Sequence, residues 1–252
     1  MEKLISDFVR EYEKREDVAT AFGEPVVAYA DAAHPYILAL KKLVSGEHHM
    51  PRDVMPEAKS VICYYIPFTK ELARTNAGGE TASPQWARAY EELNALIAEL
   101  NVRICEALEA EGYKGATSSG ASAFDREKLI SDWSQRHIAY AAGLGTFGMN
   151  NMLITEKGCC GRYSSVITDR QFRYGKPRTE ELCIFKRTGG CGICMDNCPV
   201  GAITPSGYDR KKCYGLCTKN AERFRDFGSS YGAAGSEVCG KCITGSPCAF
   251  IR

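Results

Sequence analysis

Cysteine is concentrated at one end of this chain. Nine of its 13 cysteines lie in residues 183–252, and residues 1–182 hold the other four. Because the total is odd, a framework in which every cysteine is paired in a disulfide is excluded. The same C-terminal stretch has few large apolar side chains and little sign of regular structure, and small domains of that kind usually need a metal or another staple to fold. The cysteines therefore predict a C-terminal part that folds around metal or redox centres.

The chain divides near residue 180, after the polar, basic stretch Arg170–Arg178. We expect one domain over residues 1–180 and a cysteine-rich domain over 181–252. The net charge of +1 argues against a general nucleic-acid binder, which is usually basic. No apolar run approaches the roughly 20 residues that span a bilayer. We therefore expect a cytoplasmic protein without a membrane segment, whose cysteines serve metal or redox chemistry.

Residue patterning predicts helices and strands in irregular order. Apolar residues at helical spacing predict helices, and short β-branched or aromatic runs predict strands. The expected helices are 2–15, 84–110 and 132–142, and the expected strands are 60–66, 152–155 and 164–168. Because strands and helices do not alternate regularly, the sequence favours an α+β domain over a doubly wound parallel sheet.

The strongest motif is the segment Cys191–Pro199, with the sequence CGICMDNCP. Its C-x2-C-x3-C-P spacing ends the bacterial ferredoxin run, in which the cysteine before proline ligates the second cluster of the pair. The usual leading cysteine would fall at Thr188, and Cys183 is the obvious substitute. Zinc is the alternative, although zinc hairpins do not need the Cys-Pro step. The motif therefore predicts iron–sulfur ligation.

Two groups of four cysteines predict two [4Fe–4S] clusters with crossed ligation. One cluster would be held by Cys183, Cys191, Cys194 and Cys248, and the other by Cys198, Cys213, Cys239 and Cys242. Cys217 lies four residues after Cys213 and could replace it as a ligand.

Other chemically suggestive positions have ordinary explanations as well. The segment Gly143–Gly148 matches G-x-G-x-x-G, but an expected helix precedes it, so we interpret it as a tight turn and not as a dinucleotide loop. The vicinal pair Cys159–Cys160 fits a turn beside Gly158. Asp132 would begin the helix 132–142, either as a solvated residue or as a catalytic carboxylate, and the pair His48–His49 could be exposed.

The chain resembles the epoxyqueuosine reductase family, corrinoid-dependent reductases allied to the reductive dehalogenases. The resemblance covers most of the chain and is carried by Met55–Ile62, by Ala142–Ile154 and by the order of the cysteines from Cys191 to Cys248. It implies a cobalamin-binding α+β domain, similar to nitroreductase-like B12-processing folds. That domain would receive electrons from a C-terminal domain resembling a two-cluster bacterial ferredoxin.

The resemblance also implies particular site residues. It places corrinoid binding near Phe147, Asn150 and Asn151, and it favours Cys213 over Cys217 as a cluster ligand. The family's D-S-x-P-x-x-E stretch, thought to supply a proton to the substrate, is not present in this sequence. Asp132 is the nearest carboxylate and is therefore the catalytic candidate.

The resemblance implies partners as well. An electron donor such as a ferredoxin, a flavodoxin or a reductase would feed the clusters, and a corrinoid would reduce a small or nucleoside-type substrate. The near-zero net charge, and a chain that stops four residues after Cys248 without a helical-repeat domain, argue against tRNA as that substrate. The alternative is a ferredoxin-type electron carrier that binds no corrinoid.

Overall fold

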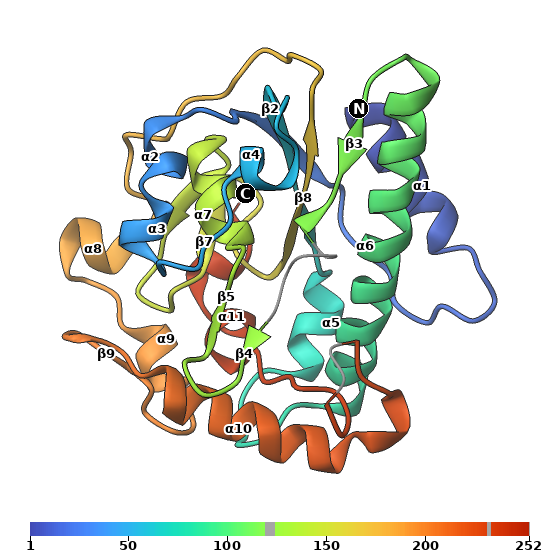
Figure 1. The fold of residues 1–252 in the computed structure, drawn as a ribbon. Helices are drawn as coiled ribbons and strands as arrows, with labels where there is room; N and C mark the ends of the chain where they lie inside the picture. Colours follow the sequence, from blue (N-terminus) through green and yellow to red (C-terminus); the bar gives the residue numbers. More distant parts are fainter. Residues whose placement is uncertain (119–123, 231–232, 252) are drawn as a thin grey trace.

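A four-stranded antiparallel sheet forms the centre of the protein (Figure 1). The computed structural model describes residues 1–118, 124–230 and 233–251. The strands are β1 (Val26–Asp31), β2 (Ser60–Pro67), β8 (Gly161–Thr168) and β3 (Gly115–Ala116), in the order β1-β2-β8-β3. Their register places Cys63 of β2 between Ala28 of β1 and Ser165 of β8. Every residue of β2 is buried, as its unbroken apolar sequence predicts for a central strand.

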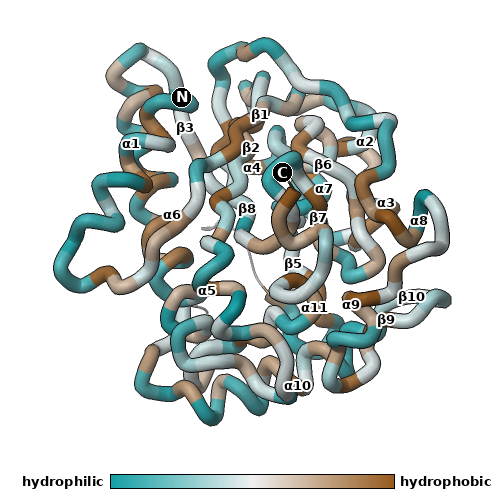
Figure 2. Tube along the Cα trace, turned by 180° about the vertical axis from the view of Figure 1, so that it is seen from behind, coloured by the Kyte–Doolittle hydropathy of each residue, from teal (hydrophilic) through white to brown (hydrophobic). Residues whose placement is uncertain are grey.

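The two faces of the sheet are covered by different helices. Helices α1 (Glu2–Tyr12) and α6 (Pro84–Ala110) cover one face, and α7 (Gln135–Ala141) covers the other. Side chains alternate along β2, so Ile62 and Tyr64 pack with the α6 leucines while Val61 and Tyr65 pack with α7. Figure 2 shows hydrophobic residues concentrated along β1 and β2, in the middle layer.

Short elements complete the N-terminal part. They are α2 (Pro35–Leu38), α3 (Leu40–Leu43), α4 (Pro51–Val54), α5 (Lys70–Thr75), β4 (Phe124–Asp125), β5 (Ile130–Ser131), β6 (Gly145–Phe147) and β7 (Leu153–Thr155). Strands β4 and β5 pair with each other, as do β6 and β7. The glycine segment 143–148 thus leads from a helix into a hairpin, which agrees with a turn and not with a dinucleotide-binding loop.

The C-terminal part is built mainly of short elements. They are α8 (Ile184–Thr188), α9 (Ile193–Asp196), β9 (Ile203–Thr204), β10 (Gly207–Tyr208), α10 (Arg210–Arg223), η2 (Arg225–Phe227), α11 (Lys241–Thr244) and η3 (Pro247–Ala249). Helix α10, at 14 residues, is the exception to the expectation of little regular structure.

The C-terminal part shares a core with the N-terminal part. Phe224, Val238, Ile243 and Ala249 belong to the same apolar cluster as the residues of α6. The ammonium of Lys241 is buried and donates to the carbonyls of residues 76 and 78. The division at residue 180 stays a prediction, but the segment after it buries its apolar side chains against α6.

The structure confirms the mixed α/β fold, with two corrections at helix ends. The helix expected over 2–15 ends at Tyr12, and the carboxylate of Glu13 accepts the amide proton of Phe22. The helix expected to begin at Asp132 begins at Gln135. The Asp132 carbonyl accepts from the amide of His49 at 2.7 Å, so this stretch pairs with another segment and cannot start a helix. Among the described residues, no helix combines the length and the apolar character needed to cross a membrane.

Candidate functional site

Four of the predicted ligands line one recess. We name Cys183, Cys191, Cys194 and Cys248 the first thiol group, and all four border a recess of about 350 Å³, counting the space at its mouth. The pKa of Cys194 is raised to about 11, by burial first and then by the neighbouring thiols of the other three members. The structure therefore brings together the four cysteines that the crossed pattern assigns to one cluster.

Local structure explains how three of these cysteines meet. Cys183 precedes α8, and Gly189 ends that helix with a φ of 72°, a left-handed conformation that glycine adopts without strain. The chain then returns to Cys191, and Cys194 follows on the single turn of α9. The C-x2-C spacing thus places Cys191 just before α9 and Cys194 on it, while the αL glycine returns the chain from Cys183 toward both.

Cys248 reaches the same recess from the end of the chain. The backbone amides of Cys159 and Cys160 donate to the carbonyls of Cys248 and Ala249 at 2.9 and 3.2 Å, which docks the C-terminal segment beside β8. The Cys159 thiol donates to the Cys248 sulfur at 3.9 Å, and the Ser246 hydroxyl lies 3.3 Å from it. These hydrogen bonds lower the pKa of Cys248 to about 6, so its thiolate is the favoured form at neutral pH.

A second thiol group lies next to the first. We give this name to Cys198, Cys213, Cys239 and Cys242, which come from the turn after α9, from α10 and from the start of α11. Burial raises the pKa of Cys242 well above its usual value, and the nearby thiols of the other three members add to the rise. The Cys198 sulfur accepts the amide proton of Ala202 at 3.2 Å. These four are the cysteines that the crossed pattern assigns to the other cluster.

Cys213 and Cys217 differ in their electrostatic setting. The Cys217 thiol and the Tyr208 hydroxyl both donate to Cys213, and the guanidinium of Arg136 is nearby, so the pKa of Cys213 falls to about 6. The pKa of Cys217 is raised well above its usual value, because it is the donor to Cys213 and because it is buried. Cys213 is thus the one that favours the thiolate form, which is the form that binds metal.

The thiols do not form a site for a single ion. Across the described ranges, no three His, Cys, Asp or Glu side chains converge closely enough to hold one metal ion. Sulfurs around a tetrahedral zinc, at about 2.3 Å from the metal, would lie about 3.8 Å from one another. The four cysteines of the first thiol group instead border a recess.

Asp132 is not the solvated helix-start residue that the sequence suggested. It lies between β5 and α7, its side chain is 12% exposed, and its carboxylate is 3.6 Å from the imidazole of His49. His48, which the sequence left open to exposure, is fully buried against Trp133, and its Nε2 accepts from the amide of Ser134. The structure thus forms a partly buried carboxylate–imidazole pair.

The predicted corrinoid contacts lie in two different settings. The Phe147 ring packs against His137 and Tyr140, with centroids 4.8 and 6.0 Å apart. The Asn150 amide is buried, donates to the Cys159 sulfur at 3.7 Å and borders the recess of the first thiol group. Asn151 adopts a left-handed φ of 59°, and its carbonyl accepts from Arg136.

Sequence reasoning missed three residues that shape these groups. Cys159 was interpreted as an ordinary turn residue, but it is buried and its thiol is hydrogen-bonded to the Cys248 sulfur. Arg136 and Tyr208 both influence Cys213. The vicinal cysteines were a visible signal, whereas the roles of Arg136 and Tyr208 depend on which distant segments pack together.

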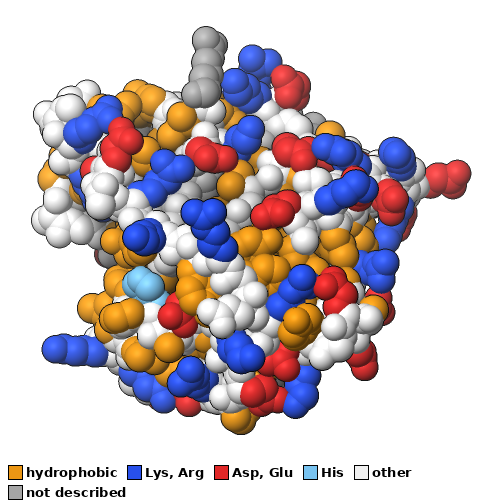
Figure 3. All heavy atoms as spheres, turned by 90° about the horizontal axis from the view of Figure 1, so that it is seen from above, with side chains coloured by type: hydrophobic (Ala, Val, Ile, Leu, Met, Phe, Trp, Pro, Cys, Tyr) orange, Lys and Arg blue, Asp and Glu red, His pale blue; other side chains and the backbone are white. Residues whose placement is uncertain are grey.

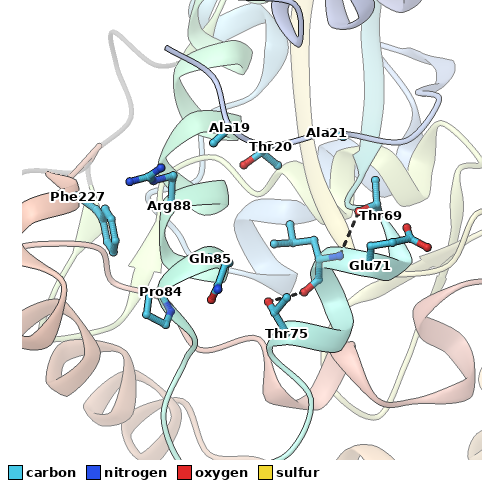
Figure 4. A pocket seen from close by; sticks show the side chains of 11 residues that line it. Ala19, Thr20, Ala21, Thr69, Glu71, Thr75, Pro84, Gln85, Arg88 and Phe227 are labelled. Carbon is cyan, nitrogen blue, oxygen red and sulfur yellow. Dashed lines mark hydrogen bonds between the residues drawn. The ribbon is translucent and has the colours of Figure 1, made fainter. Parts of the chain in front are cut away.

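The larger of the two described cavities lies elsewhere. It measures about 980 Å³, counting open space at its mouth, and is bordered by α5, the start of α6 and Phe227 (Figure 4). The guanidinium of Arg88 lies over the Phe227 ring at 5.5 Å. None of the predicted site residues borders this cavity.

Curated relatives match about two thirds to three quarters of the chain. The chain is 28% identical over 189 residues to an epoxyqueuosine reductase of Bacillus cereus, covering 70% of this chain and 45% of that protein. It is also 28% identical over 197 residues to a tetrachloroethene reductive dehalogenase of Desulfitobacterium hafniense, covering 75% of this chain and 31% of that one. The chain is a relative of the epoxyqueuosine reductases. It spans less than half the length of the curated relatives that it matches, and no family model matches it.

Solved structures share the fold. A selenomethionine-labelled epoxyqueuosine reductase superposes with a TM-score of 0.56 and 20% identity, over 98% of this chain and 66% of that one. An epoxyqueuosine reductase solved with a stem loop of epoxyqueuosine-modified tRNA gives 0.53 and 20%, over 98% and 64%. That second protein was solved with its modified tRNA stem loop, and the likeness to this chain is one of fold.

Proposed function

We propose that this chain is an oxidoreductase that passes electrons through two [4Fe–4S] clusters to a corrinoid, for the reduction of a nucleoside-type or other small substrate. The observation that carries the proposal is the arrangement of eight cysteines in two adjacent groups of four. Each group contains one thiol whose pKa is lowered to about 6, Cys248 in the first and Cys213 in the second. Thiolates are the form that binds iron.

The ligand assignment follows the two groups. We propose that the first thiol group holds one cluster, with Asn150 and Cys159 around it. The second thiol group would hold the other, with Cys213 as ligand and Cys217 as the hydrogen-bond donor to it. The amide of Ala202, which donates to Cys198, is the kind of contact that adjusts the potential of a cluster. When bound, the clusters supply one-electron transfer.

The corrinoid part of the proposal rests on the resemblance and on one feature of the structure. Phe147, Tyr140 and the uncharged His137, whose pKa burial lowers to about 4, form an aromatic and apolar group beside α7. Such a surface suits a flat macrocycle, and a bound corrinoid would supply a reducible metal centre. The Asn150 side chain already donates to Cys159 and accepts from the amide of Met152, which fixes its orientation and leaves one N–H and one lone pair for a corrinoid.

Asp132 is our candidate for the proton donor. A carboxylic acid next to an imidazole can deliver a proton and recover it from its neighbour. The Asp132–His49 pair meets that requirement, with a separation of 3.6 Å and partial access to solvent on both side chains.

One solved relative suggests which substrate to test, and the free cysteines suggest a reducing compartment. The relative solved with a modified tRNA stem loop makes a nucleoside carried in RNA the first substrate to test. All 13 cysteines are free, which fits a reducing compartment such as the cytoplasm.

The test begins with the anaerobically purified chain. Two clusters predict about eight iron and eight sulfide per chain. Cys194→Ser should lower both by about half, whereas Cys105→Ser, which alters a thiol on α6 outside both groups, should leave them unchanged. Added cobalamin should give corrinoid absorption bands that remain with the protein after gel filtration. About four iron per chain would refute the two-cluster claim, and full iron without retained cobalamin would favour the electron carrier.

A further inference from the structure

Unpaired positive charge is gathered on and beside helix α10. Six basic side chains between residues 210 and 225 are exposed, and within the described part of the chain none of them forms an ion pair: Arg210, Lys211, Lys212, Lys219, Arg223 and Arg225. The segment 209–226 contains only three acidic residues, so it carries +3 while the whole chain carries +1. The rest of the protein is therefore slightly acidic.

The inner side of the same helix contributes Cys213 to the second thiol group. At 3.6 residues per turn, Cys213 and Cys217 face the same way as the buried Leu216 and Asn220. Lys211 projects from the opposite side, and Lys212 and Lys219 project from one flank of the helix. A helix is about 10 Å across, so the thiols of α10 lie about one helix width from the basic surface. Figure 1 shows α10 along the lower edge of the molecule, with its outer side open.

We propose that this basic face, which we call the α10 face, is where a small acidic electron-donor protein docks and delivers electrons to the cluster of the second thiol group. The inference rests on the proposed function, because it requires a cluster at that place. One electron leaves the donor and enters the oxidised cluster, and no bond in this chain forms or breaks. Carriers that must bind briefly and dissociate rely on charge complementarity, which speeds encounter without requiring a large interface.

The charge distribution elsewhere supports this choice of face. On the opposite side of the molecule, seen in Figure 3, acidic and basic side chains are intermixed. Basic residues outside α10 pair with carboxylates, as Arg170 does with Glu111 and Lys114 with Glu57. The basic residues of the α10 face lack such partners and remain available to an acidic protein.

The features of the α10 face favour a protein over single-stranded RNA. Single-stranded RNA is usually held by aromatic side chains on which its bases stack. Tyr214 is the only aromatic residue within α10. Its hydroxyl donates to Glu237 at 2.6 Å and its ring packs against Phe124. The outer surface of the helix therefore offers charge without a free stacking platform.

The test measures electron entry into the cluster-loaded chain. The double variant Lys211→Glu/Lys212→Glu is mixed with reduced flavodoxin, an acidic one-electron donor, and cluster bleaching is followed by stopped flow. At low ionic strength we expect the second-order rate constant to fall about tenfold or more, because electrostatic steering changes association rates by 10 to 10³. The unmodified chain should also slow as salt is added, and the variant should be nearly insensitive to salt.

A matched control carries the same charge change elsewhere. Lys14→Glu/Lys42→Glu alters exposed lysines just after α1 and on α3, elements that lie away from α10 in Figure 1. It should keep the original rate. Both variants should contain the same iron and should be fully reduced by dithionite, which separates this inference from the proposed function. Absence of clusters would defeat the proposed function itself.

Two outcomes would overturn the docking inference while the clusters remain. One is an equal flavodoxin rate for the α10 variant, its control and the unmodified chain. The other is a loss of affinity for a tRNA stem loop in the α10 variant with no change in flavodoxin rate, which would assign the α10 face to RNA.

Discussion

Replacing Gly158 with alanine should undock the segment that carries Cys248. Gly158 has a φ of +94°, and a Cβ built on it would lie 2.1 Å from the carbonyl oxygen of Ala249 and 2.5 Å from its carbon. These are backbone atoms, which cannot rotate away as the end of a flexible side chain can. The C-terminal segment must therefore move by about 1 Å or separate from β8.

The cost has two parts, and a second glycine separates them. A left-handed conformation costs a non-glycine residue roughly 1–2 kcal/mol. Displacing the segment also weakens its hydrogen bonds from the amides of Cys159 and Cys160, each worth about 0.5–1.5 kcal/mol. Gly78 has a φ of +66° with nothing within 4 Å of its Cβ position, so Gly78→Ala meets only the conformational cost. We expect Gly158→Ala to lose about 2–5 kcal/mol and Gly78→Ala about 1–2 kcal/mol.

Urea unfolding of both variants, followed by the fluorescence of the buried tryptophans, measures these free energies. Electron paramagnetic resonance of the reduced proteins then shows whether Gly158→Ala specifically loses the signal of the cluster assigned to the first thiol group. Equal free-energy losses for the two variants, with both signals retained, would refute the argument that docking of the C-terminal segment depends on this glycine.

Further predictions concern the thiols and the proposed acid. Cys198→Ser and Cys194→Ser should abolish different electron paramagnetic resonance signals, and loss of the same signal by both would contradict crossed ligation. Cys159→Ala removes a hydrogen bond to the Cys248 sulfur, so redox titration should find the potential of that cluster lowered. In cluster-free protein, the Cys248 pKa of about 6 lies below its ordinary 9.0. The free energy of unfolding should therefore rise between pH 6 and 9 by up to about 1.4 kcal/mol per pH unit. Cys248→Ser should lose this pH dependence in urea unfolding, and a variant that keeps it would count against the lowered pKa. Asp132→Asn should slow reduction of an epoxyqueuosine stem loop by about 10² or more with iron content unchanged. A normal rate would remove Asp132 as the acid.

Local sequence determined the elements whose cause is local. The α6 helix begins and ends where its spacing predicts, because Ser83 caps it and its apolar residues repeat at helical intervals. The β-branched and aromatic run of β2 predicted a buried strand, and every residue of β2 is buried. In the cysteine motif, C-x2-C spacing places one thiol just before the turn of α9 and the other on it. These features depend on residues within a few positions of one another.

Tertiary structure decided what depends on distant segments. Cys248 joins Cys183 only because the C-terminal segment pairs with the backbone at Cys159 and Cys160. Asp132 lies outside a helix and beside His49 because the two backbones bond across about 80 residues of chain. The spacing of residues along α10 separates most of its lysines from its cysteines. Which side of α10 faces the thiols of Cys198, Cys239 and Cys242 depends on how these distant segments pack. Sequence neighbours share a turn by geometry, whereas long-range pairs are chosen by which buried surfaces and hydrogen bonds the whole fold can satisfy at once.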